Sequence, residues 1–440
     1  MYARGTAAIP LAPRPSVEQY RKIAKGLNRA WKSSDPEAVR QWATEWLERL
    51  APRAWIRAGI RHEVGEIVRI FDQLVLSAER RDKRALAYAQ WFVAWLHGFE
   101  SWPKLVRHIE SLADAGSPVS RFEAAADAVV GGDVESIERM LTAQPELIRA
   151  RSTRDHHATL LHYVAANGHE GFRQRTPRNA VAVARVLLAA GAEADALADM
   201  YEHPCTTLVM LVSSAHPHVA GVQVALVDTL VDFGAAVDGV DGDSAPLMTA
   251  LAFHYLDAAE ELVQRGARVD NLPAAAALGR ADLVDRFMRD DGSLRPGVAR
   301  PLGPWPRLST DPTEHVRHAL TWAATWGRTA VVELMLRKGA SAAAQDNDAG
   351  AIHFAAAHGH MDVVRLLLEH GASLEARNSY GGTVLSGTLW YAFNKPMPGI
   401  DYAEVVRALL ALGARADVYP AMQSRLAAVL AGKWGADPDG

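Results

Sequence analysis

The sequence has few of the features that would tie a protein to a membrane or to an oxidising compartment. Of its 440 residues only Cys205 is a cysteine, so no intramolecular disulfide can form, as is usual in a reducing cytoplasm. No apolar run approaches the roughly 20 residues that span a bilayer. The first residues also lack the apolar stretch of a signal peptide. We therefore expect a cytoplasmic protein with no membrane partner.

Motifs that carry catalytic chemistry are also missing. The chain contains no Gly-rich phosphate loop, no G-x-S-x-G nucleophile elbow and no H-E-x-x-H zinc motif. The net charge is −4, and no basic stripe of the kind that binds nucleic acid stands out, so we expect no nucleic-acid partner. The sequence favours a protein that is not an enzyme and does not indicate an oligomeric state.

What the sequence does contain is a phrase that returns along the chain. A run rich in leucine and valine ends each time in Gly-Ala, and two of the intervals between these glycines are 32 residues. A period near 33 is typical of stacked helical repeats, in which no single repeat buries enough surface to fold alone. Each repeat is expected to hold a short alanine-rich helix and a longer amphipathic one that ends at a glycine in the left-handed conformation. The phrase occurs at Gly191, Gly234, Gly266, Gly339, Gly371 and Gly413.

The best copy, residues 352–372, reads IHFAAAHGHMDVVRLLLEHGA and resembles the ankyrin repeat almost letter for letter. Residues 159–168, TLLHYVAANG, are a second clear copy. The resemblance covers about residues 121–420 and implies an all-α solenoid of about seven or eight helix-turn-helix repeats, several with insertions. It also implies that the consensus histidines stabilise turns; these are His162, His169, His353 and His360.

The region before the repeats has a different pattern. Its segment from Gly98 to Leu105, GFESWPKL, looks like a helical leader module found before bacterial ankyrin arrays. Asp35 followed by Pro36 is a helix start signal, and tryptophans on apolar faces are expected to form a core. Apolar residues at helical spacing predict helices over 17–31, 38–50, 64–76 and 85–96.

Three domains follow from these patterns. We expect an N-terminal helical domain over residues 1–118, an ankyrin array over 119–420, and a C-terminal capping helix and tail over 421–440. Insertions interrupt the array, and those that lengthen a helix–helix turn are expected to protrude on one edge of the solenoid, where loops often carry function. The insertions lie at 171–179, 215–221, 292–312 and 394–401.

The resemblance to ankyrin repeats also implies that a partner binds in the concave groove. In ankyrin repeats the two residues before the glycine that ends the first helix line this groove. Towards the C-terminus these positions change from small or polar residues to aromatic ones, and Trp and Tyr are the side chains that dominate binding hot spots. Trp322 and Phe354 lie one turn earlier and are expected to be partly buried. The predicted partner-binding residues are Phe253, Trp326, His358, Trp390 and Tyr391.

A second constellation supports the alternative function. Asp155 and His156 stand in the finger of the second repeat, and Glu202 and His203 occupy the equivalent positions of the third. Neighbouring fingers stack, so these groups could converge, and imidazoles with carboxylates bind divalent metals or perform acid–base chemistry. No other cofactor is indicated. The main hypothesis is a scaffold that binds a protein or peptide; the alternative is an enzyme, or a small-molecule or metal-binding protein, with a site walled by the insertions and the N-terminal domain.

Overall fold

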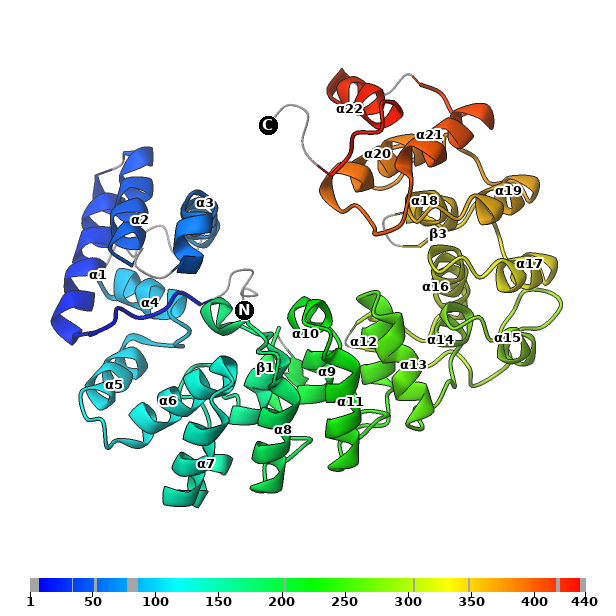
Figure 1. Cartoon of the computed structure of the whole chain (residues 1–440). Helices are drawn as coiled ribbons and strands as arrows, with labels where there is room; N and C mark the ends of the chain where they lie inside the picture. Colours follow the sequence, from blue (N-terminus) through cyan, green and yellow to red (C-terminus); the bar gives the residue numbers. More distant parts are fainter. Residues whose placement is uncertain are drawn as a thin grey trace. The chain divides into compact units, whose positions relative to one another are not determined.

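The computed structural model describes residues 8–33, 35–50, 54–76, 86–201, 203–303, 305–346, 349–416 and 420–435. Within them the fold is almost entirely helical (Figure 1). It divides into an N-terminal unit, Met1–Val240 with Tyr255–Arg265, and a C-terminal unit, Asp241–His254 with Gly266–Gly440. None of the described helices is long and apolar enough to cross a lipid bilayer.

Three of the first five helices match the expected positions closely, whereas the third begins ten residues before the predicted residue 64 and the fifth was not among the predicted ranges. Asp35 Oδ1 accepts a hydrogen bond from the amide of Glu37 (3.0 Å), so the predicted start of the second helix is confirmed. Trp31, Trp42 and Trp46 are each less than 10% exposed and form part of the core, as predicted. These helices are α1 (Val17–Lys32), α2 (Pro36–Leu50), α3 (Ala54–Leu76), α4 (Leu86–Leu96) and α5 (Trp102–Leu112).

Eight consecutive helix pairs follow, each with a first and a second helix. The second helix ends near a glycine with φ between 90° and 101° at all six positions of the returning phrase, so the predicted left-handed ends are confirmed. The pairs are α6 (Pro118–Gly131) and α7 (Val134–Ala143), η3 (Leu160–Ala165) and α8 (Ala180–Ala189), α9 (Thr207–Leu211) and α11 (Gln223–Asp232), α12 (Ala245–Ala252) and α13 (Leu256–Gln264), α14 (Leu272–Ala277) and α15 (Ala281–Phe287), α16 (Pro312–Thr325) and α17 (Thr329–Arg337), α18 (Ala351–Ala357) and α19 (Met361–Glu369), and α20 (Val384–Asn394) and α21 (Tyr402–Ala411).

Alanine allows the first helices to approach one another closely. In the C-terminal unit α14, α16, α18 and α20 contact one another in a row, and α22 (Pro420–Leu430) packs on α20 and α21 (Figure 1). The second helices supply the larger apolar side chains of the same core, among them Val363, Val364 and Leu367 of α19. Fully buried alanines line the row of first helices, among them Ala275, Ala276, Ala323, Ala324, Ala355 and Ala356.

Short two-stranded ribbons form two of the fingers between repeats. In the first, β1 (Ala198–Met200) pairs antiparallel with β2 (His203–Cys205); in the second, β3 (Gln345–Asp346) pairs with β4 (Ala349–Gly350). Both ribbons precede the first helix of a repeat, so they hold the finger at a fixed angle to the helices that follow.

The consensus histidines tie these turns to their neighbours. His162 Nε2 lies 3.2 Å from the carbonyl oxygen of Cys205, and His353 Nε2 lies 3.0 Å from that of Ala376. His360 Nε2 lies 3.0 Å from the carbonyl oxygen of Thr325, and His169 Nε2 accepts from the amide of Tyr201 (3.3 Å). The prediction that these four rings stabilise turns is confirmed.

The insertions differ in how far they stand out. Residues 171–179 form the short 3-10 helix η4 (Gly171–Arg173), which turns Arg173 into the interior instead of projecting it. Residues 215–221 form α10 (Ala215–Val219), whose Val219 is 84% exposed. Residues 292–312 are held by antiparallel bridges, Met288 with Leu294 and Leu302 with Leu308. Only part of the inserted chain therefore projects as an exposed edge.

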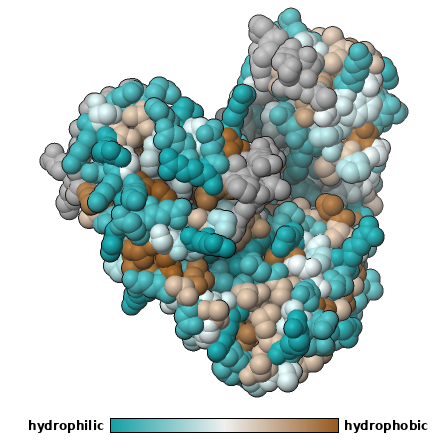
Figure 2. Space-filling model, turned by 60° about the vertical axis from the view of Figure 1, so that its left-hand side comes forward, coloured by the Kyte–Doolittle hydropathy of each residue, from teal (hydrophilic) through white to brown (hydrophobic). Residues whose placement is uncertain are grey.

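Hydrophilic residues cover much of the face that Figure 2 shows, with apolar residues in smaller groups between them. This distribution follows from the helix pattern, because each second helix keeps its apolar stripe towards the core and its charged face outward. On α19, for example, Leu367 is fully buried whereas Arg365 is exposed.

The burial of Leu367 gives a direct test of the stacking. Leu367→Ala should lower the free energy of unfolding by about 2–5 kcal/mol, because the side chain leaves a cavity in the shared core. Arg365→Ala, two residues away on the exposed face, should change it by less than about 0.5 kcal/mol. Urea unfolding followed by circular dichroism would measure both, and equal effects would contradict the packing described.

Candidate functional site

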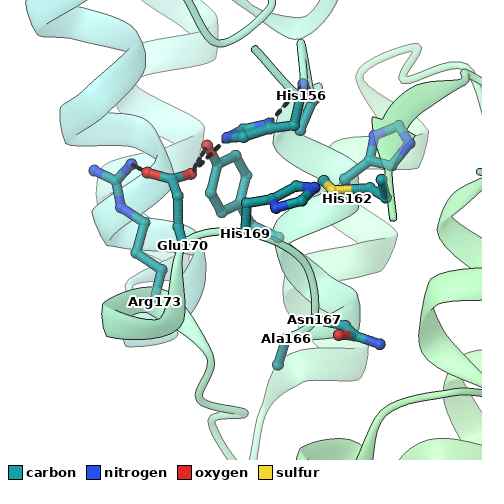
Figure 3. A pocket seen from close by; sticks show the side chains of 10 residues that line it. His156, His162, Ala166, Asn167, His169, Glu170 and Arg173 are labelled. Atoms are coloured by element: carbon teal, nitrogen blue, oxygen red, sulfur yellow. Dashed lines mark hydrogen bonds and ion pairs between the residues drawn. The ribbon is translucent and has the colours of Figure 1, made fainter. Parts of the chain in front are cut away.

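The first candidate site lies beside the fingers of the second and third repeats. The two fingers are neighbours, as expected, because the amide of Asp199 donates to the carbonyl of His156 (2.8 Å). His156 is only 1% exposed, and its Nδ1 accepts from the amide of Ala158 (3.1 Å). Its Nε2 lies 3.2 Å from a carboxylate oxygen of Glu170, and Figure 3 shows the ring turned towards this residue.

Glu170 belongs to a buried group of charges, which we call the ion cluster: Glu123, Arg154, Glu170 and Arg173. Arg154 Nε and Arg173 Nη1 lie 3.2 Å and 3.0 Å from Glu170 Oε1. The same guanidiniums reach Glu123, Arg154 Nη1 at 2.8 Å and Arg173 Nη2 at 3.0 Å. Tyr163 donates its hydroxyl hydrogen to Glu170 Oε2. Two cations thus bridge two anions in the interior, where an unpaired charge would be very costly.

The charges hold one another ionised. Burial alone would raise the pKa of Glu170, but the guanidiniums of Arg154 and Arg173 outweigh it and hold that pKa well below its usual range. Burial and then the charge of Arg154 lower the pKa of the adjacent His108 to about 4, so this ring is neutral at physiological pH. Two positive and two negative side chains balance one another in the ion cluster. This is the arrangement of a structural network, not of a catalytic acid and base whose environments move their pKa values apart.

The N-terminal region completes this network. Phe99, from the leader segment, lies beneath the Arg154 guanidinium at 5.4 Å. The amide of Asp155 donates to the carbonyl of Gly98 (2.9 Å), and His108 Nδ1 lies 2.6 Å from the hydroxyl of Thr153. The leader segment therefore docks on the finger of the second repeat, a role that its sequence did not reveal.

The cavity at this place is too small for a substrate. It measures about 10 Å³ and is bordered by His156, Tyr163, His169 and Glu170 (Figure 3). A volume of roughly 10–15 Å³ is what one water molecule requires. The residues around it can hold a water but cannot admit an organic substrate in this conformation.

Of the predicted metal group, the structure describes Asp155, His156 and His203. His156 faces Glu170, a residue that the prediction did not include, while Asp155 and His203 are half-buried. Glu202 lies outside the described residues. In the part of the chain that the structure describes, no group of three or more His, Cys, Asp or Glu side chains is placed to hold a metal ion. His156 is thus a member of a buried polar network rather than an exposed finger residue.

Cys205 has the character of a structural thiol. It is 1% exposed, and its Sγ lies 3.8 Å from the carbonyl oxygen of Met200. Burial, followed by the charge of Asp199, raises the pKa of the thiol to about 12. A thiol with such a pKa stays protonated at neutral pH, so it does not act as a nucleophile there.

The second candidate is a row of aromatic rings in the C-terminal unit, which we call the ring row: Trp326, His254, His358, Tyr391 and Trp390. The centroids of successive rings are 5.4 Å, 5.4 Å, 5.6 Å and 5.3 Å apart. Such separations are those of rings in direct contact. The rings lie near or just after the C-terminal ends of α12, α16, α18 and α20, which are the first helices of their repeats.

Members of the ring row differ in exposure. Trp390 is 45% exposed, Trp326 and Tyr391 are half-buried, and His358 is only 8% exposed. His358 Nδ1 lies 2.9 Å from the carbonyl oxygen of Phe354, so this imidazole is committed to its own helix. Trp390 and Tyr391 therefore offer the accessible surface, whereas the buried His358 packs against Tyr391.

His254 was not predicted, although it connects the two halves of the row. It follows directly after Phe253 and has φ of +64°, a left-handed conformation unusual for a residue other than glycine. This backbone conformation sets the ring beside those of Trp326 and His358. Burial, then the charges of His358 and Lys395, lower its pKa to about 4. One sequence signal could have identified His254: it stands where the ankyrin consensus has the glycine that ends the first helix.

Phe253 lies apart from the row. It is 40% exposed and meets the ring of Trp305 edge-on at 5.9 Å and 88°. Trp305 comes from the insertion 292–312, so the chain itself contacts this predicted binding residue. Trp322, expected to be partly buried, is 8% exposed and packs on His318 at 4.6 Å. Phe354 is half-buried, as expected.

The ion cluster can be tested by removing one charge. Glu170→Gln should lower the free energy of unfolding by about 3–5 kcal/mol at pH 7, because two buried guanidiniums lose their shared carboxylate. Asp127→Asn is the control, since Asp127 contacts Arg173 (2.9 Å) with a side chain 64% exposed, and its effect should stay below about 1 kcal/mol.

The same substitution should change the acid response. Because the folded-state pKa of Glu170 lies below its unfolded value of about 4.3, its stabilisation is present above that pH and is lost as the pH falls towards the folded pKa. The wild type should thus lose its advantage over Glu170→Gln in urea titrations below about pH 4.3. A constant difference down to the acid transition would show that the carboxylate is not stabilised as described.

A second pH prediction concerns His254. Its folded pKa of about 4 lies below the unfolded value of about 6.5, so the unfolded chain binds the proton and stability falls as the pH drops through this interval. His254→Asn keeps a residue that tolerates the left-handed conformation but removes the titration. Between pH 7.5 and 5 the wild type should lose about 2 kcal/mol more unfolding free energy than this variant. An identical pH dependence of the two proteins would refute the assignment.

One of the comparisons with known proteins agrees with the repeat architecture. The family model "Ankyrin repeats (3 copies)" matches residues 274–378 and 320–420, together about a third of the chain. No curated protein matches. Among solved structures, the ankyrin repeat domain of human ASB11 is 20% identical over 65% of this chain and 96% of its own, with a TM-score of 0.34. The family model falls on the helix pairs α14/α15 to α20/α21, so this part of the chain consists of ankyrin repeats.

Proposed function

We propose that the chain is a binding scaffold that captures a segment of a partner protein on the ring row of its C-terminal unit. One observation carries the proposal: five rings from four repeats of the C-terminal unit form an unbroken row, and its last member, Trp390, is 45% exposed. Ankyrin repeats commonly serve as protein-binding scaffolds, and solenoids present extended surfaces for this purpose.

The chemistry of the row supports this function. Binding hot spots are enriched in Trp and Tyr because these rings bury a large area and have few rotatable bonds. Contacts from His358 and His254 fix the rings of Tyr391 and Trp326, so little conformational freedom remains to be lost on binding. The cavity beside His156, by contrast, has room only for a water, and no observation at that place favours catalysis.

A photo-crosslinking experiment tests the proposal. With benzoylphenylalanine at position 390, irradiation of cells of the source organism should join the chain to a partner protein, because the ring stands on the proposed contact surface. The same amino acid at position 365, on the exposed face of α19, is the control and should give no specific adduct. Equal adduct patterns at the two positions would refute the proposal.

Two tryptophan substitutions separate binding from folding. Trp390→Ala should weaken capture of the crosslinked partner by a factor of at least about 10, as for a hot-spot ring. Its free energy of unfolding should change by less than about 1 kcal/mol, since the side chain is 45% exposed. Trp322→Ala should instead cost about 3–5 kcal/mol, because that ring is buried.

A further inference from the structure

A groove of about 560 Å³ opens beside the exposed end of the ring row. This volume falls within the range of sites that hold a ligand or a few peptide residues. The turn before α20 contributes Asn378 and Tyr380, and helices α18 and α20 contribute Phe354, Trp390 and Tyr391. All of them belong to the C-terminal unit, and the described lining contains no Asp, Glu, Lys or Arg.

Three side chains at the groove have polar ends without hydrogen-bond partners among the described residues. These are the indole N–H of Trp390 and the hydroxyls of Tyr380 and Tyr391, which lie on rings that are respectively 45% exposed, 85% exposed and half-buried. Tyr and Trp usually satisfy such groups when they are covered. An occupant that covered these rings would therefore need to supply hydrogen-bond acceptors.

The need to supply hydrogen-bond acceptors selects among the peptide conformations that could occupy the groove. An α-helix uses its carbonyls internally, so it has few acceptors to offer. A β-strand needs an open strand edge, and the nearby ribbon has strands of only two residues, Gln345–Asp346 and Ala349–Gly350. A polyproline II segment makes no internal hydrogen bonds and leaves its carbonyls free. Its proline rings also match an aromatic, uncharged lining.

Two exposed cations adjoin elements that line the groove. Lys395 directly follows α20, and its charge lowers the pKa of His254 and His358. Arg377 directly precedes Asn378 of the lining and donates to the carbonyl of Gly381 (2.7 Å). Cations near an uncharged groove complement a neutral core sequence with acidic residues beside it.

The insertion 292–312 of this chain contains a comparable combination of proline and aromatic residues. Its sequence Gly303-Pro304-Trp305-Pro306 places a tryptophan between prolines, and this tryptophan packs edge-on against Phe253. Phe253 precedes His254 of the ring row. A proline-flanked aromatic residue thus already contacts a surface that adjoins the row.

We propose that the groove binds a proline-rich peptide segment in the polyproline II conformation, with Trp390, Tyr391 and Tyr380 donating to its backbone carbonyls. The inference rests on the proposed function and names the class of its partner. Proline-rich segments lose little entropy on binding, because they hold this conformation before they bind.

Gly387 allows the groove to be filled without damage to the fold. It lies inside α20 and lines the groove, and nothing stands within 4 Å of the place where its Cβ would be. Leucine at this position should favour the helix while occupying the groove. Gly65→Leu in α3 is the matched control, because Gly65 is also helical with nothing within 4 Å of its Cβ position.

The experiment is a selection of random peptides displayed on phage against the wild-type chain. Enriched peptides should contain at least two prolines and bind the Gly387→Leu variant about tenfold more weakly than the wild type, with Gly65→Leu unchanged. Replacing both prolines of an enriched peptide by alanine should weaken binding by about the same factor. Fluorescence anisotropy with labelled peptides measures each affinity.

The other outcomes are informative in different ways. Peptides that lack proline, or tolerate its removal, but lose binding in Gly387→Leu would overturn this inference and leave the proposed function standing. Binding that Gly387→Leu leaves intact would also overturn the inference. If that binding also survives Trp390→Ala, or if no peptide is enriched, the proposed function fails as well.

Discussion

Each helix pair of this chain depends on a neighbouring pair to cover its apolar surface. The row α14, α16, α18 and α20 shows why, since alanines such as Ala323 and Ala356 bring the helices together but bury little area each. The larger side chains of the second helices, Leu367 among them, close the same continuous core. Stacking therefore stabilises the fold. It also decides which side chains of neighbouring repeats lie next to one another.

The ion cluster is the main exception to this apolar scheme. Arg154 and Arg173 are almost completely buried, and replacing their shared partner Glu170 would leave two guanidiniums without a counter-charge. A buried ion pair contributes little net stability, because desolvation offsets most of the attraction. Its effect here is geometric: it fixes the insertion 171–179 against α6 and sets the finger of the second repeat on the leader segment through Phe99.

The ring row follows from a repeated position in a stacked fold. One place near the end of the first helix recurs in every repeat, and in the repeats of α12, α16, α18 and α20 it carries the rings of the row. His254, His358 and Tyr391 make the line continuous, and Trp390 brings it to the surface beside the groove. The row also adjoins the core, because Tyr391 packs against the core cluster and His358 is buried.

The sequence by itself determined the helix pairs, their glycine ends and the turn-stabilising histidines, because each depends on contacts within one repeat or with the next. It also indicated that Trp326, Tyr391 and Trp390 stand near the ends of first helices, because the repeat register sets their positions. Tertiary structure alone decided the partners of side chains from distant segments: His156 faces Glu170, Trp305 packs edge-on against Phe253, and His254 joins the row through a left-handed backbone. These contacts cross insertions and irregular turns, where the repeat pattern no longer fixes which way a side chain points.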